Sequence, residues 1–141
     1  MKILIFYDGI SFRLRNKKNT IRLINEVIRN NGLIPGDLNF IFTSDNNLLE
    51  INREFLKHNY YTDVIAFGGT DKGVVSGEIY ISIDHVRNNA YNYKVSLERE
   101  VIRVVVHGVL HLCGFIDDFE DEKEEMHRLE EIWLKKYMDL K

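Results

Sequence analysis

The segment LEREVIRVVVHGVLHLCGFID, residues 97–117, predicts a long helix that is apolar around most of its circumference. Ser96 precedes it as a favourable N-cap, and Gly114 can end it with a left-handed residue. Such a helix is expected to lie at the centre of the molecule. Its apolar residues are Val101, Ile102, Val104, Val105, Val106, Val109, Leu110 and Leu112.

Two histidines lie one turn apart on this helix. His107 and His111 should therefore point their imidazoles the same way, either as hydrogen-bonded core histidines or as metal ligands. Gly114 lets the chain turn back, which brings Asp117 within reach of the same point, with Asp118 as the rival. Three convergent ligands with an open fourth position are typical of catalytic zinc sites. We predict a metal site at His107, His111 and Asp117.

The spacing is similar to the zinc-protease ladder H-E-x-x-H-x-x-G-x-x-H, with two differences. Gly108 replaces the glutamate that accepts a proton from the metal-bound water, and Asp117 replaces the last histidine. Peptide hydrolysis therefore lacks its main base, whereas a metal can still polarise a phosphoryl oxygen. Cys113 should lie on the opposite face of the helix as a small buried hydrophobe. Phosphodiester chemistry fits these residues better than proteolysis.

The remaining chain predicts strands and helices in mixed order. Strands are expected at 2–7, 37–43, 63–67 and 77–83, and helices at about 20–32, 44–55, 84–93 and 121–138. The last two strands should form a hairpin around a turn at 68–73. In the last helix, Met126, Leu129, Ile132, Trp133 and Tyr137 should point inward. We expect an α+β fold with a four-stranded mixed sheet packed with helices.

The composition predicts one cytoplasmic domain, residues 1–141. The single cysteine excludes an internal disulfide and suits a reducing compartment. The N-terminal apolar run is cut short by Asp8, which makes it too short for a signal peptide. No segment is long and apolar enough for a membrane span, so no membrane partner is expected. The net charge of −3 argues against nonspecific coating of nucleic acid.

Several motifs together resemble the YbeY family of ribosomal-RNA maturation endoribonucleases. They are HGVLHLCG at 107–114, TDVIAF at 62–67 and GEIYIS at 77–82, with Asn52 and Glu100. The resemblance implies a four-stranded sheet, one zinc ion per chain, and metal-dependent cleavage of single-stranded RNA. It further implies a role in maturation of the 16S 3′ end and in ribosome quality control. The implied partners are ribosomal RNA and ribosomal subunits, with ribosomal proteins or GTPase assembly factors as further candidates.

The chain departs from this family at two positions. The family usually has histidine where this chain has Asp117, which gives a ligand set of two histidines and one carboxylate. The carboxylate lowers the charge of the site by one unit, which weakens the Lewis acid and the preference for zinc over manganese or iron. The family also tends to have arginine at Leu56. Arg53 and Lys57 could replace its phosphate contact, or could simply be solvated charges at a helix end.

Two alternatives to a nuclease follow from the same residues. One is a zinc-containing ribosome assembly factor without catalysis, and the other is a metalloprotease-like hydrolase. An open fourth coordination position favours catalysis, whereas a fourth protein ligand favours a structural metal. Tyr60 and Tyr61 could stack on unpaired bases, which would favour RNA, or pack on the sheet edge.

Overall fold

The computed structural model of the protein describes residues 2–139 and has an α+β architecture. This confirms the predicted fold class and its four-stranded sheet. The strands are β1 (Ile3–Tyr7), β2 (Ile34–Thr43), β3 (Val64–Asp71) and β4 (Val74–Ser82). The helices are α1 (Lys17–Asn30), α2 (Asp45–Leu56), α3 (Ile83–Tyr93), α4 (Leu97–Leu112) and α5 (Glu120–Asp139). None of these helices is long and apolar enough to cross a membrane.

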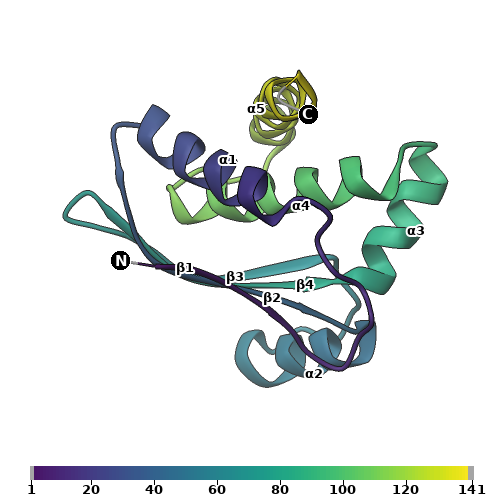
Figure 1. Ribbon diagram of the computed structural model, residues 1–141. Coiled ribbons are helices and arrows are strands. Elements are labelled where there is room, and N and C mark those ends of the chain that lie inside the picture. Colours follow the sequence, from purple (N-terminus) through teal and green to yellow (C-terminus); the bar gives the residue numbers. More distant parts are fainter. Residues whose placement is uncertain (1, 140–141) are drawn as a thin grey trace.

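The sheet is mixed, with the strand order β1-β2-β4-β3. β2 pairs in parallel with both β1 and β4, and β3 pairs antiparallel with β4. A parallel pair needs a crossover connection, which α1 supplies between β1 and β2. α1 and α2 cover opposite faces of the sheet (Figure 1). The strand order makes β1 and β3 the two edge strands of the sheet.

α4 is the central helix of the molecule, as predicted. It packs between the sheet and α5, with α1 and α3 at its sides (Figure 1). Its apolar side chains are almost fully buried and join those of the inner sheet face in one core. α2 lies alone on the other face (Figure 1).

The β3–β4 hairpin is confirmed, but its strands are longer than predicted. Pairing continues to Asp71 and Val74, so Lys72 and Gly73 alone form the turn. Both turn residues have positive φ, 50° and 81°, as a tight two-residue hairpin turn requires. The glycine-rich sequence at 68–73 predicts a six-residue turn, whereas the observed turn has two residues. Pairing with β4 extends the strand because glycine weakens strand propensity without blocking ladder hydrogen bonds.

One core prediction on α5 is wrong. Ile132 is 42% exposed, although it was expected to point inward. The buried stripe of α5 instead has three- and four-residue spacing, and Ile132 lies off it. An acidic residue occupies a position of that stripe where an apolar one would be expected. The stripe consists of Met126, Glu130, Trp133, Leu134 and Tyr137.

Candidate metal centre

The end of α4 brings the predicted ligands together. Gly114 adopts φ 106°, and its N–H donates to the carbonyl of His111 over 3.0 Å. The N–H of Phe115 donates to the carbonyl of Leu110 over 3.0 Å, which completes a left-handed helix end. Thr70 on β3 donates its hydroxyl to the carbonyl of Leu112 over 2.8 Å. The edge strand therefore holds the end of α4 while the chain turns back along the helix.

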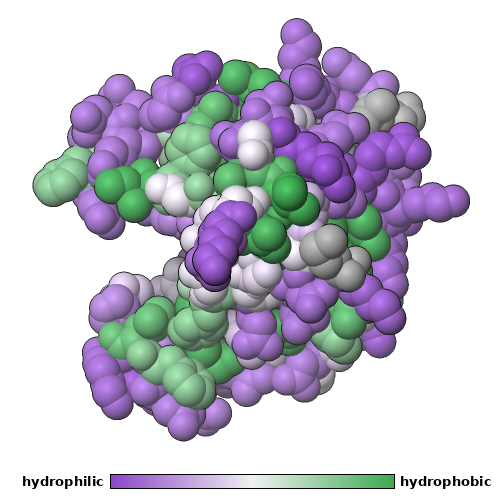
Figure 2. All heavy atoms as spheres, turned by 90° about the vertical axis from the view of Figure 1, so that its left-hand side faces the viewer, coloured by the Kyte–Doolittle hydropathy of each residue, from purple (hydrophilic) through white to green (hydrophobic). Residues whose placement is uncertain are grey.

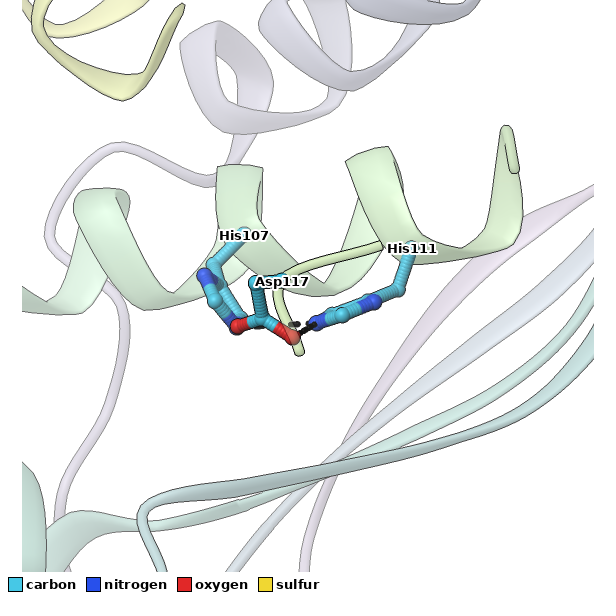
Figure 3. A group of neighbouring side chains, drawn as sticks. All are labelled: His107, His111 and Asp117. Carbon is cyan, nitrogen blue, oxygen red and sulfur yellow. Dashed lines mark hydrogen bonds and ion pairs between the residues drawn. The ribbon is translucent and has the colours of Figure 1, made fainter. Parts of the chain in front are cut away.

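His107, His111 and Asp117 form the cluster that the sequence predicts, with one candidate ligand atom from each within 4.8 Å of the others (Figure 3). The two Nε2 atoms are 3.0 Å apart. Asp117 Oδ2 lies 3.4 Å from His107 Nε2, and its Oδ1 lies 3.4 Å from His111 Nε2. Ligands about 2.1 Å from a tetrahedral ion are separated by roughly 3.4 Å. These three side chains could therefore bind a metal ion.

The cluster is half-buried and offers three candidate protein ligands. The side chains of His107, His111 and Asp117 are 19%, 29% and 29% exposed, so another molecule can reach the centre. A small pocket of about 190 Å³ opens beside His107 and Asp117, between α4 and α5. Across residues 2–139, no fourth histidine, cysteine, aspartate or glutamate joins the group. This arrangement is the one typical of catalytic rather than structural metal sites.

The two other candidate ligands lie outside the cluster. Asp118 is exposed, and its backbone N–H donates to Glu122 over 3.1 Å at the start of α5. Cys113 packs against the hydrophobic core. Burial raises the pKa of its thiol to about 11, so the thiol is protonated at neutral pH, whereas a metal ligand must be a thiolate.

His107 also contacts a buried carboxylate on α5. Its Nδ1 lies 2.6 Å from Oε2 of Glu130, whose residue is only 2% exposed. Burial alone would lower the pKa of His107, but the hydrogen bond and charge of Glu130, with Asp117 and Asp63, outweigh burial and raise it. Sequence reasoning missed Glu130. The signal was present as an acidic residue four positions after Met126, on the apolar stripe of α5.

Arg103 neutralises part of this negative charge. Its guanidinium donates to Glu100 over 2.7 and 2.9 Å and to Glu130 over 3.1 Å. The carboxylate of Asp63, just before β3, lies 3.5 Å away. Although burial opposes its charge, the hydrogen bonds and charges of Glu100 and Glu130 raise the pKa of Arg103. Because Asp63 directly precedes β3, its contact with Arg103 turns this face of α4 toward the start of β3. His107 lies one turn further along the same face.

Gly108 faces the sheet rather than the cluster. A Cβ atom at this position would lie 3.0 Å from Cγ2 and 3.2 Å from Cδ1 of Ile79 on β4. The position at which the zinc proteases have their catalytic glutamate is therefore a close contact between α4 and β4. A side chain there could not reach the three ligands without moving the helix.

The two predicted phosphate-binding residues lie at the end of α2 and contact none of the described cluster residues. Arg53 is exposed, and its Nε–H donates to the side-chain oxygen of Asn59. Lys57 is exposed and ends α2 in the left-handed conformation, with φ 59°. The surface is hollowed between the lobe that carries α2 and the helices of the other layer (Figure 2). A ligand that contacts both the cluster and these two cations would have to extend across this hollow.

Exposed aromatic and aliphatic side chains gather on the two segments that flank the α2 end and the cluster. Phe55 is 63% exposed, and Tyr60 and Tyr61 in the following loop are 55% and 51% exposed. On the loop after α4, Ile116 is 55% and Phe119 is 70% exposed. Both tyrosine rings are therefore accessible from solvent, as stacking on unpaired bases would require.

Comparison with known proteins places the chain in a family. The family model described as "Endoribonuclease YbeY" matches residues 10–138. Endoribonuclease YbeY of Phocaeicola vulgatus is 41% identical over 123 residues, which cover 87% of this chain and 89% of the relative. Endoribonuclease YbeY of Flavobacterium psychrophilum is 41% identical over 130 residues, 92% of this chain and 93% of the relative.

A solved structure agrees with the fold. The solution structure of TM1509 from Thermotoga maritima superimposes with a TM-score of 0.69 at 28% sequence identity. The match covers 96% of this chain and 89% of that one. The family match, residues 10–138, includes all three clustered side chains, strands β2, β3 and β4, and the packed helices up to residue 138. The chain therefore belongs to the YbeY family of endoribonucleases.

Proposed function

We propose that this protein is a zinc-dependent endoribonuclease that cleaves single-stranded RNA during maturation of the 3′ end of 16S ribosomal RNA and in ribosome quality control. One observation carries the proposal: His107 Nε2, His111 Nε2 and the Asp117 carboxylate converge at a solvent-accessible point in a member of the YbeY family. Ribosomal RNA in its subunits is the proposed substrate, and ribosomal proteins or GTPase assembly factors are the proposed partners. We place the protein in the cytoplasm and treat residues 1–141 as one functional domain.

The three clustered side chains would hold the zinc ion through Nε2, Nε2 and a carboxylate oxygen. When bound, zinc supplies a Lewis acid for a phosphoryl oxygen and lowers the pKa of a water molecule. Asp117 offsets one positive charge of the site, so the ion would be a weaker Lewis acid than one held by three histidines. Arg53 and Lys57 would bind neighbouring phosphates, and Tyr60 and Tyr61 would stack on unpaired bases.

Two observations weigh against the alternatives. Gly108 packs on Ile79, so the general base of a metalloprotease is missing and has no room. Within the described residues the cluster offers three ligands, whereas a structural zinc site is closed by four. Incubation of the zinc-loaded protein with structured ribosomal RNA, followed by mapping of the ends, tests the activity itself. A 5′-phosphate would identify water as the nucleophile, and a 5′-hydroxyl with a cyclic phosphate would identify the 2′-hydroxyl.

The third ligand can be tested by metal content. Asp117→Ala should reduce metal occupancy strongly because it removes one of three ligands. Asp118→Ala is the matched control, since Asp118 is the next residue, carries the same charge and lies outside the cluster. Elemental analysis after equilibration with limiting zinc should give about one ion per chain for wild type and Asp118→Ala, as expected for one site. Equal retention of metal by both variants would exclude Asp117 as a ligand.

The proposed phosphate contacts can be tested by salt dependence. Arg53→Gln with Lys57→Asn removes two charges, and asparagine tolerates the left-handed conformation at position 57. RNA affinity should fall, and the slope of log K against log salt should flatten by about 1.4 if both residues contact phosphates of a single strand. The measurement is fluorescence anisotropy with single-stranded RNA at several salt concentrations.

A matched control lies on α3. Lys94 ends α3 in the same left-handed conformation, with φ 57°, and both Lys94 and Arg87 are exposed. Arg87→Gln with Lys94→Asn therefore makes the same chemical changes on another helix. An equal loss of affinity in both double variants would mean that overall charge, rather than the α2 end, binds the RNA.

A further inference from the structure

We infer that Glu130 on α5 is a positioning residue for the metal site, which fixes His107 so that its Nε2 faces the ion. The inference rests on the proposed metal site and assigns a role there to the C-terminal helix. His107 and Glu130 are 23 residues apart in sequence and come from different helices. Their contact is therefore a product of how α4 and α5 pack.

The geometry of His107 leaves each ring nitrogen one role. Nδ1 lies 2.6 Å from Glu130 Oε2, and a carboxylate can only accept, so Nδ1 carries the proton that is donated. In the neutral ring, Nε2 then has the free lone pair. That atom is the one 3.0 Å from His111 Nε2 and 3.4 Å from Asp117 Oδ2. Glu130 thus selects the tautomer and the ring orientation that the ligand cluster needs.

Glu130 is itself held in place on its other side. Oε1 accepts from Nη1 of Arg103 over 3.1 Å, so the two carboxylate oxygens serve two different partners. Arg103 in turn donates two hydrogen bonds to Glu100, which is 2% exposed. A buried carboxylate is expensive unless it is paired, and these contacts give both Glu130 and Glu100 their partners. Glu100, Arg103, Glu130 and His107 form one connected set.

The consequence is a pre-oriented ligand. A histidine that is free to rotate must lose that freedom when it binds an ion. In addition, one of its two neutral tautomers carries the proton on Nε2 and so has no lone pair there for the ion. Carboxylates that accept from a ligand histidine remove both costs, and their replacement typically weakens metal binding by 10–100-fold. Glu130 does not touch the proposed ion or the RNA, so its effect should be transmitted through His107.

The test compares two neighbouring glutamates of α5. Glu130→Gln keeps the size of the side chain and removes its charge. Glu131→Gln makes the identical change one residue later, where Glu131 pairs with Arg99 of α4 over 2.6 Å and is 43% exposed. Zinc affinity of the metal-stripped proteins is measured by competition with a chelating dye. We expect Glu130→Gln to bind zinc about 10–100-fold more weakly than wild type, and Glu131→Gln to match wild type.

A second readout needs no variant and reports on the tautomer directly. Long-range ¹H–¹⁵N spectra of zinc-loaded wild type should show His107 protonated at Nδ1 and bound through Nε2. Binding through Nδ1 would overturn the inference, whatever the stability of Glu130→Gln. Equal zinc affinity of Glu130→Gln and Glu131→Gln would also overturn it while leaving the metal site intact. A wild type that binds no zinc would overturn the proposed site together with this role for Glu130.

Discussion

His111→Ala is expected to abolish RNA cleavage while it leaves most of the RNA affinity. The substitution removes one of the three proposed ligands. Loss of the ion would remove charge stabilisation of the transition state that is worth several kcal/mol. Since each 1.36 kcal/mol is tenfold in rate, cleavage should fall by about a thousandfold or more. RNA affinity comes mainly from phosphate contacts and should change little. Single-turnover cleavage and anisotropy on the same RNA measure the two effects separately.

The control for this variant is another partly exposed histidine away from the cluster. His85 on α3 lies 3.6 Å from Asp45, and its side chain is 32% exposed. His85→Ala should cleave RNA at the wild-type rate. Thermal unfolding of His111→Ala without added metal distinguishes the alternatives, because a structural zinc protein should lose its fold with its metal. A metal-free His111→Ala that still cut RNA at the wild-type rate would refute the mechanism.

Gly108→Glu should be the most destabilising single change considered. It inserts a charged side chain where even a Cβ would lie 3.0 Å from Ile79. Both Gly108 and Ile79 are buried. Overpacking costs about 1–3 kcal/mol, and burial of an unpaired carboxylate adds a further cost of several kcal/mol. The expected loss in the free energy of unfolding is therefore about 3 kcal/mol or more, measured by urea denaturation.

Gly108→Ala separates the contact from the charge. Alanine gains about 1 kcal/mol of helix propensity over glycine, which offsets the tight approach to Ile79. Its stability should therefore stay near that of wild type. The glutamate variant should also acquire no activity against unfolded polypeptide, because position 108 faces β4. A stable Gly108→Glu with peptidase activity would contradict both the packing argument and the exclusion of a protease.

The local elements were predictable because each carries its own signal. Ser44 and Ser96 cap α2 and α4 through side-chain hydrogen bonds to the backbone, as their sequence positions indicate. The apolar residues around most of α4 predicted that this helix is buried, because a helix that is apolar on all sides must be covered on all sides. The extra strand residues at 68–71 and the exposed Ile132 were missed. Both depend on a neighbouring element, β4 in one case and α4 in the other.

Local sequence alone was enough to predict the cluster of three candidate ligands. His107 and His111 share a helix face through the four-residue period, and Gly114 permits the reversal that returns Asp117 to them. All three lie within eleven residues, so local geometry is sufficient to bring them together. Hence the candidate metal site could be predicted before any tertiary contact was known.

The surroundings of that cluster follow from tertiary contacts between distant parts of the chain. The sheet order β1-β2-β4-β3 places Ile79 beneath Gly108, and the packing of α5 on α4 places Glu130 against His107. The sequence separations are large, and nothing in a local pattern specifies which buried carboxylate meets which imidazole. Those pairings follow from the arrangement in which α4 buries its apolar surface against β4 and α5. In the same arrangement, every charge of the Glu100–Arg103–Glu130 set keeps a partner.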